Sequence, residues 1–152
     1  MLEKFYRDHA RAIYAYLVSQ CRDPVWAEDL MQDTFVRATR ALAGYRGGSP
    51  RAWLFAIART TFLDDVRRRS RNPTSDEPTD VAAFDPDIAQ QITVRTVLAN
   101  LPETQRSALI LRDQLGLSYE EVSGVLGKSL GATKVIIHRA RAAFRTAFEK
   151  EA

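Results

Sequence analysis

Apolar residues recur along this chain at the three- and four-residue spacing of a helix. Phe5, Ile13 and Leu17 lie on one such stripe, and a second stripe extends from residue 27 to residue 42. No segment alternates apolar and polar residues with the β-branched enrichment of a strand. The pattern therefore predicts an all-α protein.

Capping signals divide the first half of this pattern into separate helices. Asp23-Pro24 and Ser49-Pro50 each place a cap residue before a proline at the first helical position. They predict one helix that stops before Gly44 and another that continues to about Arg69. Gly47-Gly48 is expected to form a turn or loop between them.

The second half of the chain predicts a helix-turn-helix. One helix is expected from about Asp87 to Asn100, and the next starts at Pro102-Glu103. Ser118 and Glu121 have the spacing of a capping box, and Ser129 is a plausible cap for a last helix over about 130–145. Two short helices around Gly127, the second one basic, are typical of a unit that lays its second helix in the DNA major groove.

The charge pattern separates two basic regions. Residues 1–72 carry a net charge of +5, residues 73–94 have no basic residue and a net charge of −5, and residues 95–152 carry +3. Two basic regions indicate two contacts with a polyanion. We predict two small helical domains, 1–72 and 87–152, joined by a flexible acidic linker over 73–86.

Composition excludes several classes of protein. The apolar runs are too short to cross a bilayer, and the N-terminus lacks the apolar segment of a signal peptide. Cys21 is the single cysteine and is expected to be a small buried hydrophobe. His9 and His138 have no partner ligands for a metal ion nearby in the sequence. We therefore predict a cytoplasmic protein with no disulfide, metal or cofactor.

Two surfaces of the first domain carry candidate chemistry. Asp29, Gln32 and Asp33 share one helix face, which spacing alone would class as solvated polar surface. In the third helix Trp53 lies among arginines, where it either stacks on an unpaired base or belongs to the core. The cluster over 67–71 favours contact with phosphates.

Four motifs in order resemble a known family. They are AEDLMQDTFVRA at 27–38, PRAWLFAIAR at 50–59, DDVRRR at 64–69 and LPE at 101–103, followed by the helix-turn-helix. Together they strongly resemble the extracytoplasmic-function (ECF) group of bacterial sigma factors. The resemblance spans nearly the whole chain except the acidic linker, and implies regions 2 and 4 of the sigma-70 family.

The resemblance implies a role for each matching position in the first domain. Asp29, Gln32 and Asp33 match the face that binds the β′ clamp helices of core RNA polymerase. A loop and a helix match the part that captures and holds the melted −10 element. These −10 residues are Tyr45, Arg46, Gly47, Gly48, Ser49, Trp53, Arg59, Arg67, Arg68 and Arg69.

In the last helix, Thr133, Ile137, Ala140 and Phe144 are expected to face inward. Lys134, Val135, His138 and Arg139 then face the −35 duplex. Arg139 is the best candidate for a base contact, because arginine pairs bidentately with guanine, whereas Lys134 and Arg141 are expected to bind phosphate. Val135, Ile136 and Thr60 depart from the usual family residues, which leaves base preference open, and an exposed Ile136 would mark a contact with a partner or between domains.

The predicted partners are promoter DNA, the β′ clamp helices and β flap of the polymerase, and an anti-sigma factor that could hold the chain at the membrane. Two alternatives stay open. One is a stand-alone helix-turn-helix regulator that binds its operator without polymerase. The other is a hydrolase using Asp64-Asp65 or Glu120-Glu121, although adjacent carboxylates on a helix point about 100° apart.

Overall fold

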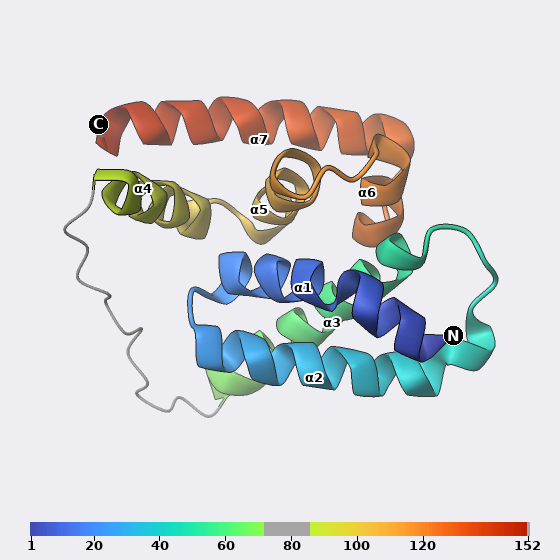
Figure 1. The fold of residues 1–152 in the computed structure, drawn as a ribbon. Helices are drawn as coiled ribbons and strands as arrows, with labels where there is room; N and C mark the ends of the chain where they lie inside the picture. The colour runs from blue at the N-terminus through green and yellow to red at the C-terminus, as the bar shows by residue number, and fades with distance from the viewer. Residues whose placement is uncertain (72–85, 152) are drawn as a thin grey trace.

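The computed structural model describes residues 1–71 and 86–151, and it is helical with no strand in these ranges, as predicted. The linker expected over 73–86 lies outside the described residues except for Pro86, which begins a helix. The α-helices are α1 (Leu2–Cys21), α2 (Pro24–Ala41), α3 (Pro50–Arg71), α4 (Pro86–Asn100), α5 (Glu103–Leu109), α6 (Tyr119–Leu126) and α7 (Leu130–Glu151) (Figure 1).

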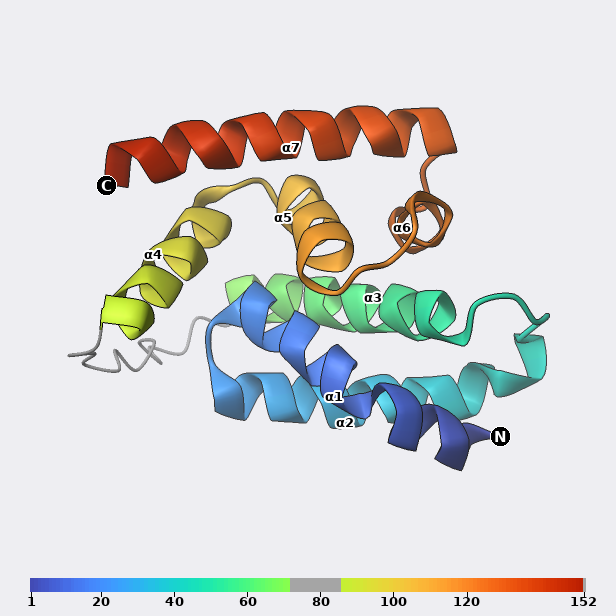
Figure 2. The same ribbon diagram turned by 45° about the horizontal axis from the view of Figure 1, so that its top comes forward.

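The helices form two units that lie against each other. Helices α1–α3 make the N-terminal unit and α4–α7 the C-terminal unit, which covers α1 and α3 in both orientations of the ribbon (Figures 1 and 2). The contact between α3 and α6 is the most extensive one between the units. Segments far apart in the sequence therefore share one boundary, which we call the inter-unit interface.

The junction of α1 and α2 follows from its capping residues. Arg22 adopts a left-handed φ of 59° and donates its backbone N–H to Val18, ending α1. The Asp23 carboxylate then accepts from the N–H groups of Val25 and Trp26 at 3.0 and 3.3 Å, which starts α2 as predicted. Beside it, Cys21 is half-buried, and burial raises the pKa of its thiol to about 11.

The helix-turn-helix is also formed as the capping signals predict. Ser118 and Glu121 make the reciprocal capping box at the start of α6, and Gly127 ends that helix at a φ of 65°. Ser129 accepts from the backbone of Ala132 at 3.1 Å at the start of α7. The helix expected after Pro102 is different, because α5 gives way before Gly116 to one turn of π-helix (η2, Ile110–Gln114), which we call the π-turn.

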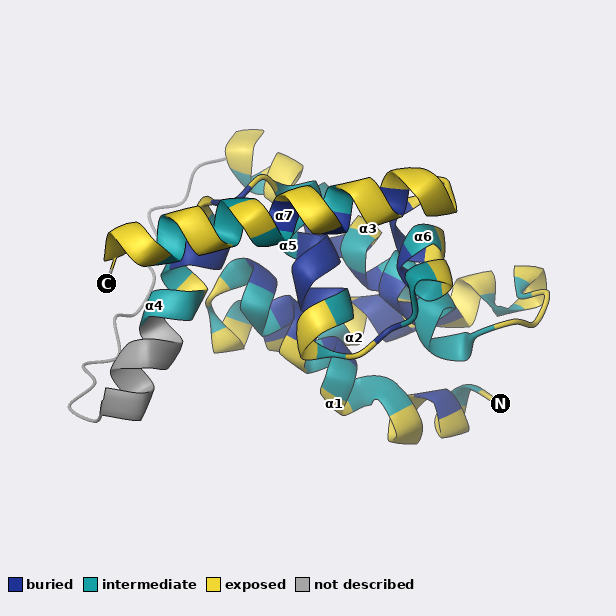
Figure 3. Ribbon diagram, turned by 90° about the horizontal axis from the view of Figure 1, so that it is seen from above, coloured by how far each residue is buried: buried dark blue, intermediate teal, exposed yellow. Residues whose placement is uncertain are grey.

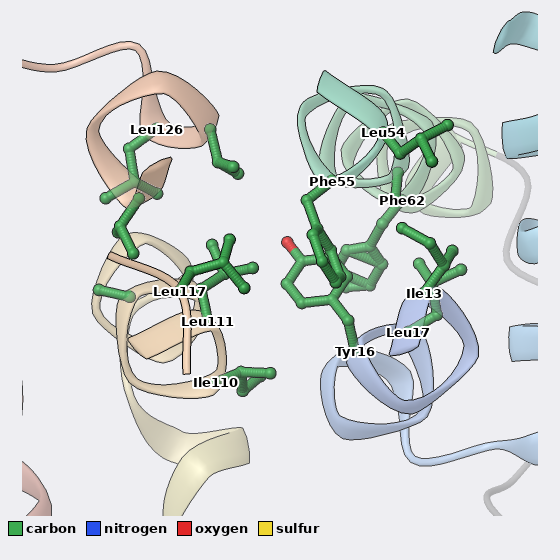
Figure 4. Close-up of a cluster of buried hydrophobic side chains, with 14 of the residues drawn as sticks. Ile13, Tyr16, Leu17, Leu54, Phe55, Phe62, Ile110, Leu111, Leu117 and Leu126 are labelled. Atoms are coloured by element: carbon green, nitrogen blue, oxygen red, sulfur yellow. The ribbon is translucent and has the colours of Figure 1, made fainter. Parts of the chain in front are cut away.

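A single apolar cluster extends across both units. Figure 4 shows Tyr16 and Phe55 pointing toward Leu111 and Leu117, and all four side chains are almost completely buried. Separating the units would expose this surface, at roughly 25 cal/mol for each Å² of apolar area. Docking of the units is therefore stabilised by the same apolar burial that folds each of them.

Helix α7 is longer than predicted, ending at Glu151. Its second half packs on α4, where Val94, Leu98, Phe144 and Phe148 line an apolar groove. The rings of Phe144 and Phe148 stack with their centroids 5.8 Å apart. The outer face of the helix is exposed along its length (Figure 3).

We predict that Asp23→Ala lowers the free energy of unfolding by about 1 kcal/mol, because two backbone N–H groups at the start of α2 lose their acceptor. Urea denaturation followed by circular dichroism measures this change. Val25→Ala, at an exposed position of the same turn, is the control and should be nearly neutral. Equal effects of the two substitutions would contradict the role of the cap.

Candidate nucleic-acid and polymerase interface

The acidic face of α2 is open to solvent. Asp29, Gln32 and Asp33 are all exposed, while Ala27 and Leu30 on the other side of the helix are buried. Asp33 makes one exposed ion pair with Arg37 at 3.5 Å, which is a weak interaction. The three predicted polymerase-binding side chains are thus together and available to a partner.

The loop between α2 and α3 is built for a close approach. Gly47 and Gly48 adopt φ values of 89° and 84°, and nothing lies within 4 Å of the position that a Cβ would take in either. The Tyr45 hydroxyl donates to the carbonyl of Gly48 at 3.0 Å. Arg46 is exposed. The backbone of this loop can therefore approach another molecule without a side chain in between.

Trp53 lies partly in the core and partly at the surface. Its ring packs against Phe5 and Tyr45, with centroids 6.1 and 5.0 Å apart, so it supports the core. It is nevertheless only partly buried, and it borders a shallow hollow that Ile57 and Thr60 also line. Part of the indole surface stays available for stacking.

The arginines at the end of α3 are held by neighbouring carboxylates. Arg67 pairs with Asp64 at 3.3 Å, and Asp65 receives both Arg68 and Arg69, at 2.5 and 3.2 Å. The guanidinium of Arg69 also stacks 3.9 Å from the centre of the Trp26 ring. These arginines are therefore fixed on the surface, with Arg67 and Arg68 mostly exposed.

Asp64 and Asp65 turn to different partners. Asp64 accepts from Arg37 at 2.9 Å, whereas Asp65 accepts from the indole N–H of Trp26 at 2.6 Å. Burial would raise the pKa of Asp65, but the hydrogen bonds from Trp26 and Arg68 outweigh it and hold the pKa below its ordinary value. The two carboxylates connect α2 to α3 and do not converge on one point.

Helix α7 exposes the four residues that were predicted to face the −35 duplex, and we call this surface the reading face. Lys134, Val135, His138 and Arg139 are exposed in its first half, and Thr133, Ile137 and Ala140 are buried on the opposite side. Phe144 is half-buried. The expectation of an exposed Ile136 is wrong, since this residue is partly buried and packs against the core.

Arg141, which was also predicted to bind phosphate, is held by a carboxylate of its own unit. Its guanidinium donates two hydrogen bonds to Asp113 of the π-turn, at 3.0 and 2.6 Å. The side chain is 41% exposed. A phosphate would have to share this guanidinium with Asp113.

Arg59 and Ser49, both predicted to contact the −10 element, face the C-terminal unit instead of solvent. Arg59 donates two hydrogen bonds to Glu103 of α5, at 3.0 and 2.8 Å. Ser49 donates to Glu121 of α6 at 2.6 Å. Arg51 joins it with two hydrogen bonds of 2.7 Å to the same carboxylate.

These pairs shift the titration of both glutamates. The hydrogen bond from Arg51 is the main cause that lowers the pKa of Glu121 to about 2. Burial would raise the pKa of Glu103, but hydrogen bonds from Arg59 and Ser107 outweigh it and lower the pKa. Both side chains are therefore ionised at neutral pH.

A buried polar network completes the inter-unit interface. The side-chain amide nitrogen of Gln20 donates to the Ser107 hydroxyl at 2.5 Å and to the Tyr16 hydroxyl at 3.0 Å. Arg106 donates to the side-chain oxygen Oε1 of Gln20 at 2.6 Å. Burial raises the pKa of Tyr16 to about 12, so its hydroxyl stays neutral. Sequence reasoning missed this network, because nothing in the local pattern around these residues marks an interaction across the chain.

Comparison with known proteins identifies the chain. Residues 5–72 match Sigma-70 region 2, and residues 91–144 match Sigma-70, region 4. The chain belongs to the ECF group of the sigma-70 family. Its function is therefore promoter-specific initiation of transcription by RNA polymerase.

Several relatives illustrate the match. The ECF sigma factor is 36% identical to RNA polymerase sigma factor YlaC of Bacillus subtilis, over 92% of this chain and 87% of that protein. It is 36% identical to ECF sigma factor SigE of Mycolicibacterium smegmatis, over 94% of this chain but 60% of the relative. Among solved structures, the sigma factor RpoE of Bartonella quintana, in complex with the anti-sigma factor NepR, aligns with a TM-score of 0.77 at 26% identity, covering 97% and 96% of the two chains.

Two further observations concern the described part of this sigma factor. None of its helices there has both the length and the apolar character of a membrane span. The same residues contain no cluster of three or more histidine, cysteine or acidic side chains able to hold a metal ion.

We predict that acid weakens the docking of the two units. The docked pKa of Glu121, about 2, lies below its ordinary value of 4.5, so its contribution is complete above about pH 4.5 and is lost as the pH falls through about 2. Thermal unfolding between pH 7 and pH 2 measures this loss.

Glu121→Gln should reduce the pH dependence of stability in that window, because glutamine also satisfies a capping box but does not titrate. The control, Glu120→Gln, changes an exposed neighbour on the same helix and should keep the wild-type dependence. Identical pH profiles for wild type and Glu121→Gln would contradict the assignment.

Proposed function

We propose that this sigma factor reads the −35 duplex with α7 and the melted −10 strand with the N-terminal unit while its α2 face binds core polymerase. The observation that carries the proposal is the reading face of α7. Lys134, His138 and Arg139 are exposed on the second helix of the helix-turn-helix, where such units contact base edges. Val135, also exposed, suits an apolar contact with a thymine methyl group.

The −10 element is assigned to the loop over 45–49 and the exposed side of α3. The two glycines allow the backbone to approach a flipped base, and the exposed part of Trp53 suits stacking, which contributes about 1–3 kcal/mol per base. Arg67, Arg68 and Arg69 supply positive charge at the end of the same helix. The free energy for strand opening then comes from base stacking and base capture. The chain itself catalyses no reaction.

Polymerase contacts are assigned to two surfaces. Asp29, Gln32 and Asp33 are exposed together on α2 and are proposed to bind the β′ clamp helices. We assign the β flap to the C-terminal unit, whose groove between α4 and α7 offers apolar surface to a protein partner. An anti-sigma factor is a further proposed partner, supported by the likeness to RpoE, whose structure contains one.

The proposed location is the cytoplasm, on the nucleoid with polymerase or held at the membrane by an anti-sigma factor. The hydrolase alternative loses its support, since Asp64 pairs with Arg37 while Asp65 pairs with Arg68 and Arg69. Glu121 serves as a cap and as an ion-pair partner of Arg51. Reconstituted transcription with core polymerase and a genomic promoter pool tests the function as a whole, and absence of any specific start site would refute it.

We predict that Gln32→Ala combined with Asp33→Ala abolishes binding to core polymerase, because the α2 face loses its central polar groups while the core beneath is untouched. Co-elution of the purified proteins at low salt measures this. Asp8→Ala removes an exposed carboxylate from α1 and should bind like wild type. Retained binding by the double variant would refute the face assignment.

We predict that Arg139→Ala weakens promoter binding by holoenzyme by about 1–3 kcal/mol and relaxes preference at one −35 position. Lys134→Ala should weaken binding to all DNA sequences alike. It should also lower the number of ions released on binding by about one, which reduces the salt dependence of the affinity. Competition binding with variant −35 DNA sequences at several salt concentrations distinguishes a loss of sequence preference from a loss of salt dependence. Lys150→Ala, at the far end of α7, is the control, and the same effect from all three substitutions would contradict the assignment.

A further inference from the structure

Two carboxylates of the C-terminal unit bind the same helix of the N-terminal unit in the same way. The Glu103 carboxylate accepts hydrogen bonds from Nε and Nη2 of Arg59. The Glu121 carboxylate accepts hydrogen bonds from the same two nitrogens of Arg51. Glu103, Glu121 and Arg59 are less than 20% exposed, whereas Arg51 is 39% exposed. These are well-formed ion pairs at a partly desolvated boundary and not incidental surface contacts.

The geometry around Glu121 is that of an oxyanion site. Three donors of the N-terminal unit converge on one carboxylate: the Ser49 hydroxyl at 2.6 Å, and two nitrogens of Arg51 at 2.7 Å each. The same carboxylate also accepts from the backbone N–H of Ser118 at 3.0 Å, within its own unit. A planar guanidinium with a neighbouring hydroxyl binds phosphate oxygens by the same fork geometry. Arg59 provides a second such site eight residues further along α3, about 12 Å away along the helix axis.

The remainder of the inter-unit interface is compatible with reversible separation. Beside the apolar contacts of Tyr16 and Phe55 with the C-terminal unit, it contains the polar network of Gln20, Ser107 and Arg106. Among the described residues no buried side-chain polar atom lacks a hydrogen-bond partner. Water can replace these hydrogen bonds when the units part. Interfaces between domains that move relative to each other are typically of this mixed kind.

We propose that the docked arrangement is a self-masked state in which Glu103 and Glu121 occupy, in place of DNA phosphates, an anion-binding strip formed by Ser49, just before α3, and by Arg51 and Arg59 of α3. The proposal rests on the function proposed above, which gives the loop over 45–49 and so Ser49 to the −10 strand, and it adds Arg51 and Arg59 as phosphate contacts. Promoter DNA and the C-terminal unit then compete for the same three side chains, and the chain must open before it binds the melted strand.

The test uses the full-length chain with Glu103→Gln and Glu121→Gln combined. Glutamine keeps the shape of each side chain and suits the capping position of Glu121, so the helices should form normally, which far-ultraviolet circular dichroism checks. The matched control combines Glu120→Gln and Glu149→Gln, which removes the same charge from two exposed positions of the C-terminal unit.

Opening is measured as the distance between spin labels at Arg40→Cys and Ala142→Cys, with Cys21→Ser in all samples. Both label positions are exposed and lie in different units. The wild type and the control should give one narrow distance distribution, and the double variant a longer and broader one. An unchanged distribution in the double variant would overturn the proposal.

Masking is measured as the affinity of each protein variant for single-stranded DNA. This DNA carries the −10 region of a promoter that the reconstituted transcription assay identifies. The double variant should bind this strand several-fold more tightly than wild type at low salt, and Arg51→Ala within the double variant should remove that gain. Opening without a gain in affinity would refute masking. No binding by any variant, including an opened one, would instead refute the −10 assignment itself, which the distance measurement does not depend on.

Discussion

The pairing of carboxylates on one unit with arginines on the other is the interaction on which the arrangement of this sigma factor depends. Apolar burial brings α3 against the C-terminal unit, but burial is not directional and would tolerate a range of orientations. The bidentate pairs of Arg51 with Glu121 and Arg59 with Glu103 fix the orientation. The polar groups therefore determine how the two units are oriented, and the apolar groups supply most of the free energy of docking.

Helix α3 carries positive charge in two different settings. Toward its start, Arg51 and Arg59 are neutralised by the other unit. Toward its end, Arg67, Arg68 and Arg69 are balanced by Asp64 and Asp65 of the same helix, at spacings of three and four residues. The local pairs hold their arginines in place in any arrangement of the chain, whereas the pairs between units exist only when the units are docked.

Much of the fold was predictable because its signals are local. The starts of α2 and α6 follow from Asp23 and Ser118, whose side chains bond to backbone groups two or three residues away. The exposed faces of α2 and α7 follow from helical periodicity. These features depend only on neighbours in sequence, and so a single sequence contains them.

Docking of the units was not predictable, because its determinants are far apart in the chain. Glu121 has an obvious local role as a cap, and nothing in the sequence distinguishes its second role as partner of Arg51, 70 residues away. Glu103 likewise reads only as a favourable residue at the start of α5. The π-turn over 110–114 has no signal among the capping residues, since it replaces a helical turn within an apolar segment.

The continuity of α7 has a mechanical consequence. The reading face in its first half and the second half that packs on α4 belong to one uninterrupted helix, with Lys134 and Phe148 about 20 Å apart along the axis. Because no break separates the two halves within Leu130–Glu151, a tilt at one end would be passed on to the other. Whatever shifts Phe144 and Phe148 against α4 therefore re-aims Arg139, although it never touches that side chain.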